Sequence, residues 1–235
     1  MSSKKLGIMQ PYFFPYIGYF QLINAVDEHI IYDDVNFIKG GWINRNRILV
    51  NGEPSYINVQ LSKASPNKLI NELSIYPDSR LQKKLLLTLE SNYKKAPYFE
   101  VIYPFLEEMI STMDGQLSTF LAECLKAVCN YLGIQTTILL SSELEKDSSL
   151  KSEAKVIDIC KRRDADIYIN AIGGQHLYDY SHFASNGITL RFINSAPIVY
   201  KQFDNDFCPN LSIIDVMMFN SVETIKKYLD SYTLI

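Results

Sequence analysis

Short apolar runs alternate with helix-like segments along the chain, and the first of them mark a candidate site. The apolar run Leu6–Met9 is followed by Gln10 and an aromatic turn between two prolines, and then by helical spacing over 19–26. A second apolar run, His29–Tyr32, stops at two adjacent aspartates. This order predicts a strand, a tight turn, a helix and a strand, with polar residues after both strands. Because open α/β sheets bind ligands at the carboxyl ends of their strands, we expect a site at this edge.

A small hairpin and three helices come next. Two short β-type runs over 48–61 flank an Asn51-Gly52 turn, which is a strong hairpin signal. Residues 69–76 have the composition of a further strand. Helices are expected at 79–93, 98–113 and 115–132, with Asp78 capping the first, Pro97 beginning the second and Gly133 ending the third.

In the second half of the chain, strands again alternate with helices. Strands are predicted at 136–140, 166–170, 188–193 and 198–202, and helices at 151–163, 177–186, 212–219 and 221–231. The turns 172–175 and 208–210 separate some of these elements. We therefore predict one domain over 1–235 in the α/β class, with a mainly parallel (Rossmann-like) sheet, flanking helices, a small inserted hairpin and a central helical block.

Composition and charge narrow the classes of function. The 235 residues are 47% hydrophobic and 21% charged, which is ordinary for a globular protein. A net charge of −3 provides no general attraction to nucleic acid or to an anionic membrane. No apolar run approaches the length of a membrane span and no signal peptide precedes the first strand, so we expect a cytoplasmic protein. The four cysteines have no CxxC spacing, and we expect them to be reduced.

The segment Trp42-Ile-Asn-Arg-Asn-Arg47 is the strongest signal for ligand binding, because it is a basic cluster in an acidic chain. Arg45 can fork onto a diphosphate, Asn44 and Asn46 supply donors and acceptors, and Trp42 offers a stacking face for a base or a sugar. The alternative is an exposed polar loop with one buried tryptophan.

The turn after the first strand is the second candidate, with Gln10, Tyr12, Tyr16, Gly18 and Tyr19 as possible substrate-binding residues. Its prolines and glycine bring backbone close to a ligand, and its tyrosine hydroxyls need partners. The alternative is a rigid connection whose aromatic rings fill a core. Tyr16-Ile-Gly-Tyr19 has the spacing of the H-x-G-H motif of nucleotidylyltransferases, and tyrosines in place of both imidazoles argue against adenylyl transfer but not against nucleotide binding.

The candidate general bases are Asp33 and His176. Adjacent residues of a strand point to opposite faces, so at most one of Asp33 and Asp34 is expected to face the site. His176 follows Gly173 and Gly174, whose backbone N–H groups could hold an anion, although a plain turn is equally consistent. The other two histidines, His29 and His182, are expected to be structural. No second carboxylate at a useful spacing supports a magnesium site, so no metal ligands are predicted.

Ser212 and Asp215 are interpreted as structural residues at the start of the predicted helix 212–219. Ser212 can cap that helix, and Asp215 falls at the third position after it, as in a capping box. A serine, histidine and aspartate could be combined into a triad, but no G-x-S-x-G elbow is present, and we reject nucleophilic-serine chemistry.

Five motifs resemble those of the WbqC-like protein family, and the resemblance spans nearly the whole chain. The family's Q-P-x-Y-F-P-W-x-G-Y-F and S-W-x-N-R-N-x-I correspond to residues 10–20 and 41–48, with Tyr16 in place of Trp and Gly41 in place of Ser. Its Y-x-N-x-x-G-G-x-x-L-Y corresponds to Tyr168–Tyr178, and the following F-x-x-x-G-I-x-L-x-F to Phe183–Phe192. Its closing F-x-P-x-L-S-I-I-D corresponds to Phe207–Asp215.

The resemblance implies a role in the synthesis of O-antigen and other surface polysaccharides, with transfer of glycine or a comparable acyl group to a sugar as one activity. The expected partners are a nucleotide-linked amino sugar and an unidentified acyl or aminoacyl donor, with no nucleic acid and no membrane. No motif identifies a cofactor. A nucleotidylyltransferase-like enzyme and a non-catalytic binder of a nucleotide-sugar precursor are the alternatives. We expect one cleft to contain Gln10, Asp33, Trp42, Arg45 and Gly173, with 48–61 and 79–132 away from its floor.

Overall fold

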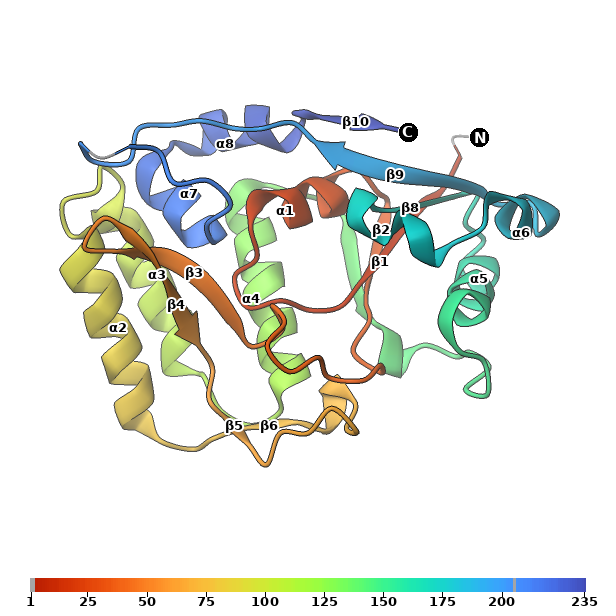
Figure 1. Ribbon diagram of the computed structural model, residues 1–235, viewed down its shortest axis with the longest axis horizontal. Helices are drawn as coiled ribbons and strands as arrows, with labels where there is room; N and C mark the ends of the chain where they lie inside the picture. Colours follow the sequence, from red (N-terminus) through yellow and green to blue (C-terminus); the bar gives the residue numbers. More distant parts are fainter. Residues whose placement is uncertain (1–2, 205) are drawn as a thin grey trace.

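A six-stranded sheet organises the fold (Figure 1), in a computed structural model that describes residues 3–204 and 206–235. The strand order is β10-β9-β8-β1-β2-β7. All neighbouring strands are parallel except β10, which runs antiparallel to β9. The bounds are β1 (Lys5–Met9), β2 (Glu28–Ile31), β7 (Thr137–Leu140), β8 (Ile167–Ala171), β9 (Thr189–Ser195) and β10 (Tyr232–Leu234). The predicted α/β class with a mainly parallel sheet is confirmed.

The direction of strand addition reverses between β1 and β8. From β1 the chain adds β2 and β7 on one side, and it then adds β8 and β9 on the other side of β1. The connections that leave β1 and β8 therefore diverge to opposite sides. A crevice at the carboxyl ends of these two strands is the usual consequence of such a reversal.

Helices cover both faces of the sheet. Helix α1 (Ile17–Asn24) packs on one face, and α5 (Ser152–Arg162) and α6 (Tyr180–Ser185) pack on the other. Strand β1 shows why α1 can approach closely: a Cβ on Gly7 would lie 3.5 Å from side-chain atoms of Leu22 and Val26. A larger residue at position 7 would push α1 away from the sheet.

A helical block adjoins the sheet, on the left in Figure 1, and its hydrophobic core continues into α1 and β2. It contains α2 (Ser79–Tyr93), α3 (Phe99–Ser111), α4 (Leu117–Leu132), α7 (Ile213–Phe219), α8 (Val222–Leu229) and the hairpin β3–β4 (Arg45–Val50 and Glu53–Asn58). Asp78 caps α2 by accepting the Arg80 N–H, and Gly133 ends α4 with φ 73°, as predicted. In the described part of the chain, no helix combines the length and apolarity needed to cross a bilayer.

Several predicted boundaries differ from the structure. The hairpin begins at Arg45, three residues earlier than predicted. Residues 69–76 divide into a 3-10 turn, η1 (Ile70–Glu72), and a short β6 (Ser74–Ile75) that pairs with β5 (Leu61–Ser62). The predicted helix 177–186 is instead the 3-10 segment η3 (Ile172–Leu177) followed by α6, and β10 was not predicted.

The predicted strand 198–202 is wrong, and a buried carboxylate explains the difference. Tyr200 donates its hydroxyl to Asp215 Oδ1 at 2.6 Å, and Gln202 Nε2 donates to the same oxygen at 2.6 Å. These contacts fix the segment as an extended loop against α7 instead of a sheet strand. Asp215 therefore does not serve in a capping box, whereas Ser212 does cap α7 by accepting the Ile214 N–H.

The second oxygen of Asp215 extends this network into the hairpin. It accepts a hydrogen bond from the Tyr93 hydroxyl at 2.7 Å, and that hydroxyl accepts the Leu49 N–H at 2.9 Å. Burial raises the pKa of Asp215 and outweighs the opposing effect of its three donors. The Tyr93 hydroxyl thus connects α2 with β3 and α7.

Replacing Tyr93 with Phe is expected to destabilise the protein by about 1–3 kcal/mol, because it leaves a buried N–H and a buried carboxylate each without one partner. Urea denaturation measures the change. Tyr103→Phe is the matched control in α3, where the ring stacks on Phe99, and it should change stability by less than about 0.5 kcal/mol. Equal stability of the two variants would contradict the role given to the Tyr93 hydroxyl.

Candidate functional site

A large cavity lies at the crevice created by the strand reversal, and we call it the main cleft. Its volume is about 770 Å³, within the range of small-molecule sites. Its walls include Gln10 after β1, Tyr32 after β2, Asn170 in β8 and Asn194 in β9. The lining contains these residues predicted from the sequence: Gln10, Tyr12, Tyr16, Gly18, Tyr19, Trp42, Gly173 and Gly174.

Aromatic rings and carboxamides dominate the chemistry of the main cleft. Five of its lining residues are tyrosines, and Asn170 is held by donating Nδ2 to the hydroxyls of Tyr168 at 2.7 Å and Tyr178 at 3.1 Å. The lining residues of the main cleft are uncharged at neutral pH. Such walls suit stacking on flat rings and hydrogen bonds to hydroxyl or amide groups.

A smaller chamber opens from the main cleft beside Trp42, and we call it the Arg47 chamber. Its volume is about 300 Å³, and it shares Tyr12, Tyr16, Trp42 and Asn210 with the main cleft. The Arg47 guanidinium lies 5.8 Å from the Trp42 ring centroid, and one of its nitrogens donates to the Asn210 carbonyl at 3.4 Å. Its Nε is buried with no hydrogen-bond partner among the described residues. A cation with an unused buried donor beside an indole favours an anionic, aromatic ligand.

Arg45 and Asn44 do not line this chamber or the main cleft. Arg45 donates Nε to the Gly41 carbonyl at 3.0 Å and a second nitrogen to the Gly40 carbonyl, and its guanidinium lies 4.4 Å from the Tyr56 ring centroid. Asn44 donates to the Val59 carbonyl at 2.9 Å. The expectation that Arg45 shares a cleft with Gln10 is therefore not met, because its guanidinium is engaged within its own loop.

Asn46 contributes to the wall of the Arg47 chamber, but its amide holds the turn after β1. Its Nδ2 donates to the carbonyls of Phe13 at 3.1 Å and Phe14 at 2.8 Å. The Ser212 hydroxyl donates to the same Phe14 oxygen at 2.7 Å. Phe14 has φ 40°, an unfavourable conformation for a side-chain-bearing residue, and these bonds stabilise it.

The two adjacent aspartates are engaged away from the main cleft. Asp33 is fully buried and accepts the N–H of Ser142 at 2.9 Å and its hydroxyl at 2.6 Å, in η2 (Ser141–Glu143). Asp34 pairs with Lys155 at 2.8 Å and with Lys146 at 3.1 Å. Burial alone would raise the pKa of Asp34, but hydrogen bonds from the two lysines lower it below its ordinary value. The expectation that Asp33 lines the shared cleft is not met.

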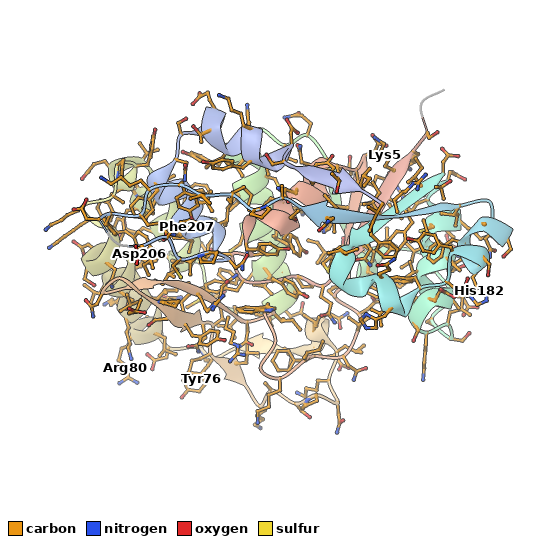
Figure 2. The ribbon with its side chains drawn as sticks, turned by 45° about the horizontal axis from the view of Figure 1, so that its top comes forward. Lys5, Tyr76, Arg80, His182, Asp206 and Phe207 are labelled. Atoms are coloured by element: carbon orange, nitrogen blue, oxygen red, sulfur yellow. The ribbon has the colours of Figure 1, made fainter. Side chains whose placement is uncertain are left out.

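The three histidines have different surroundings. His176 is exposed on η3, whose neighbouring residues Gly173, Gly174 and Leu177 line the main cleft, although His176 itself does not. His182 pairs with Glu153 at 2.6 Å, and Figure 2 shows it near the right-hand end of the molecule. His29 is buried, with Nε2 3.4 Å from the Tyr19 hydroxyl, which donates to the Gln10 carbonyl at 2.9 Å.

Several polar residues that line the cleft were not selected from the sequence, and they include Tyr32, Asn170, Tyr178, Asn194, Ser195 and Asn210. Asn170 is the last residue of a predicted strand, so its place at the sheet edge gave a usable signal. Asn210 has φ 58° in the loop before α7, and it lines both the main cleft and the Arg47 chamber. Among residues 3–204 and 206–235, no group of three His, Cys, Asp or Glu side chains is arranged to hold a metal ion.

The fold and the cavity define an α/β protein with a cleft at the strand reversal of a mainly parallel sheet. The chain belongs to the WbqC-like protein family, whose family model matches residues 10–227. It is also similar to the uncharacterized protein Rv1507c of Mycobacterium tuberculosis (strain ATCC 25618 / H37Rv), with 31% identity over 220 residues that cover 92% of this chain and 94% of the relative. No solved structure matches the chain.

His29 beneath the cleft is expected to make stability depend on pH. Burial lowers its pKa from 6.5 to about 3, so between these values the unfolded chain binds a proton that the folded protein does not. The free energy of unfolding should therefore fall as the pH is lowered from about 6.5 towards 3. His29→Phe keeps a ring against Tyr19 and should show a weaker dependence in chemical denaturation. Identical pH profiles for the variant and the parent would contradict this assignment.

Proposed function

We propose that this protein is a transferase of surface-polysaccharide biosynthesis that forms an amide on the amine of a nucleotide-linked amino sugar. The observation that carries the proposal is the joining of two unlike compartments. The Arg47 chamber offers a cation beside the indole of Trp42, which it shares with the main cleft, whereas the rest of the main cleft offers neutral aromatic and amide groups. A nucleotide diphosphate joined to a sugar has the same division between an anionic, aromatic part and a neutral polar part.

In the proposed orientation, the nucleotide diphosphate lies in the Arg47 chamber and the sugar lies in the main cleft. Arg47 binds the diphosphate, for which its guanidinium has suitable fork geometry, and Trp42 provides a face for the base. Gln10, Asn170 and Asn194 lie in the main cleft, where their amides can bind sugar hydroxyls. Arg45, engaged with Gly40 and Gly41, has no contact with the ligand in this arrangement.

The reaction requires a free amine and an activated acyl group. The amine nitrogen forms a bond to the carbonyl carbon, and the bond from that carbon to the donor's leaving group breaks, with its electron pair staying on the leaving group. One amine proton must be removed. We assign this to His176, because it stands on the segment that lines the cleft, while His29 is buried against Tyr19 and His182 pairs with Glu153.

We propose that the protein acts in the cytoplasm, because nucleotide-linked sugars are made there.

A non-catalytic binder of the same nucleotide sugar is the second candidate, because tyrosines and amides line the cleft and both aspartates are engaged elsewhere. The binder would hold the ligand without turnover. A nucleotidylyltransferase-like activity is a further alternative, and it would consume a nucleoside triphosphate. Tyr16 and Tyr19 stand at the positions where that superfamily has its two histidines.

Arg47→Ala is expected to weaken binding of a nucleotide-linked amino sugar by roughly 10- to 100-fold, since it removes a charged hydrogen-bond donor from the diphosphate. A thermal-shift screen of UDP-, dTDP- and GDP-linked amino sugars selects the ligand, and calorimetry measures the affinity. Arg45→Ala, two residues away on the same strand, is the matched control and should change affinity less than about twofold. Equal losses in both variants, or no loss in either, would exclude the proposed placement.

His176→Ala is expected to lower turnover by on the order of 10²-fold and to flatten the rise of activity with pH, because it removes the base. Mass spectrometry of the acylated sugar follows the reaction, and the affinity for the nucleotide sugar should not change. His182→Ala controls for loss of an imidazole and should retain activity. Full activity of His176→Ala would assign the proton to solvent, whereas binding without turnover in the parent would favour the binder.

A further inference from the structure

A third compartment opens from the main cleft, and we call it the side lobe. Its volume is about 360 Å³. It lies between the start of α1, the segment after β9, the loop before α7, and α7 itself. Its walls are mainly apolar, and they include Ile17, Ile198, Val199, Phe207, Leu211 and Val216. Phe207 is labelled in Figure 2.

Polar groups are concentrated where the side lobe joins the main cleft. Tyr16, Ser195 and Asn210 line both compartments, and they supply a phenol, a hydroxyl and a carboxamide. Tyr200 also lines the lobe, but its hydroxyl donates to the buried Asp215, so the lobe gains little polar surface from it. A ligand that fits this arrangement has a polar group at the junction and an apolar chain behind it.

We infer that the side lobe holds the apolar chain of the transferred acyl group, with the acyl carbonyl at the junction of Tyr16, Ser195 and Asn210. This inference rests on the proposed acyl transfer and specifies its donor. The sugar amine would approach the carbonyl from the main cleft, which meets the side lobe at the same three residues. Hydroxyl and amide donors at the junction are suited to the carbonyl oxygen, where negative charge develops during attack.

The size and the walls of the lobe distinguish between acyl groups. A glycyl group is small and carries an ammonium, which loses hydration in an apolar compartment without gaining a partner. An aliphatic chain of several carbons instead buries apolar surface with each methylene. The side lobe therefore favours an aliphatic acyl group over glycyl.

Simple amides test the lobe without a nucleotide. Propanamide and hexanamide share a carbonyl and differ in chain length, and glycinamide carries the charge of a glycyl group. Methyl NMR spectra of the intact protein would follow Ile17, Ile198, Val199, Leu211 and Val216. Hexanamide should shift these signals in a saturable manner, with an apparent dissociation constant that falls roughly fourfold per added methylene. Glycinamide should leave them unchanged, and Leu87, exposed on α2, should not respond to any amide.

Two substitutions test whether the NMR shifts caused by hexanamide arise from binding in the side lobe. Ala196→Phe places a ring in the lobe from an exposed position, and it should remove the response to hexanamide. Ala184→Phe, at an exposed position on α6, is the matched control and should retain it. Val199→Asp, at a side chain that is 69% exposed, supplies a second test by adding a charge to the wall. A hexanamide response that is absent from the parent, or unchanged in Ala196→Phe and Val199→Asp, would overturn the inference. Failure of the proposed function would show separately, as nucleotide-sugar binding that does not depend on Arg47.

Discussion

The carbonyl oxygen of Phe14 is the point on which the site depends. Asn46 and Ser212 both donate to it, and the next carbonyl, that of Pro15, accepts the N–H of Ile213 at 2.9 Å. Three segments far apart in the chain, the turn after β1, the start of β3 and the start of α7, are thereby joined at one place. A left-handed Phe14 costs about 1–3 kcal/mol, and these hydrogen bonds offset it. Tyr16, Arg47 and Asn210 are positioned by this junction, since each lies within two residues of one of its members.

The opposite wall is fixed differently. It comes from the sheet, where Asn170 at the end of β8 joins the hydroxyls of Tyr168 and Tyr178. The adjacent aspartates are engaged within the protein, Asp34 in ion pairs with two lysines and Asp33 in hydrogen bonds from Ser142. What remains to face a ligand is neutral in the main cleft and cationic only beside Trp42. Recognition is therefore divided between stacking and amide contacts on one side and a single guanidinium on the other.

The sequence predicts the sheet edge well and the directions of its side chains poorly. Apolar runs that stop at polar residues locate strand ends, which is why Gln10 and Gly173, from distant segments, were correctly expected in one cleft. Asp33 also follows a strand, but burial by η2 turns it inward, and no local pattern reports that contact. Arg45 was named for the anion site and Arg47 was not, yet both lie in β3, and only their different tertiary contacts distinguish them. Asn210 and the loop 198–202 depend on tertiary contacts with Arg47 and Asp215, which periodicity cannot encode.

Tyr16 and Asn210 line all three compartments, and this shared position couples the shapes of the compartments. A substitution at either residue therefore alters the walls of all three at once. Residues that line one compartment alone, such as Val199 in the side lobe or Tyr178 in the main cleft, are free of this coupling. Substitutions at such outer positions change one compartment and leave the walls of the other two unaltered, whereas a change at the shared pair alters all three together.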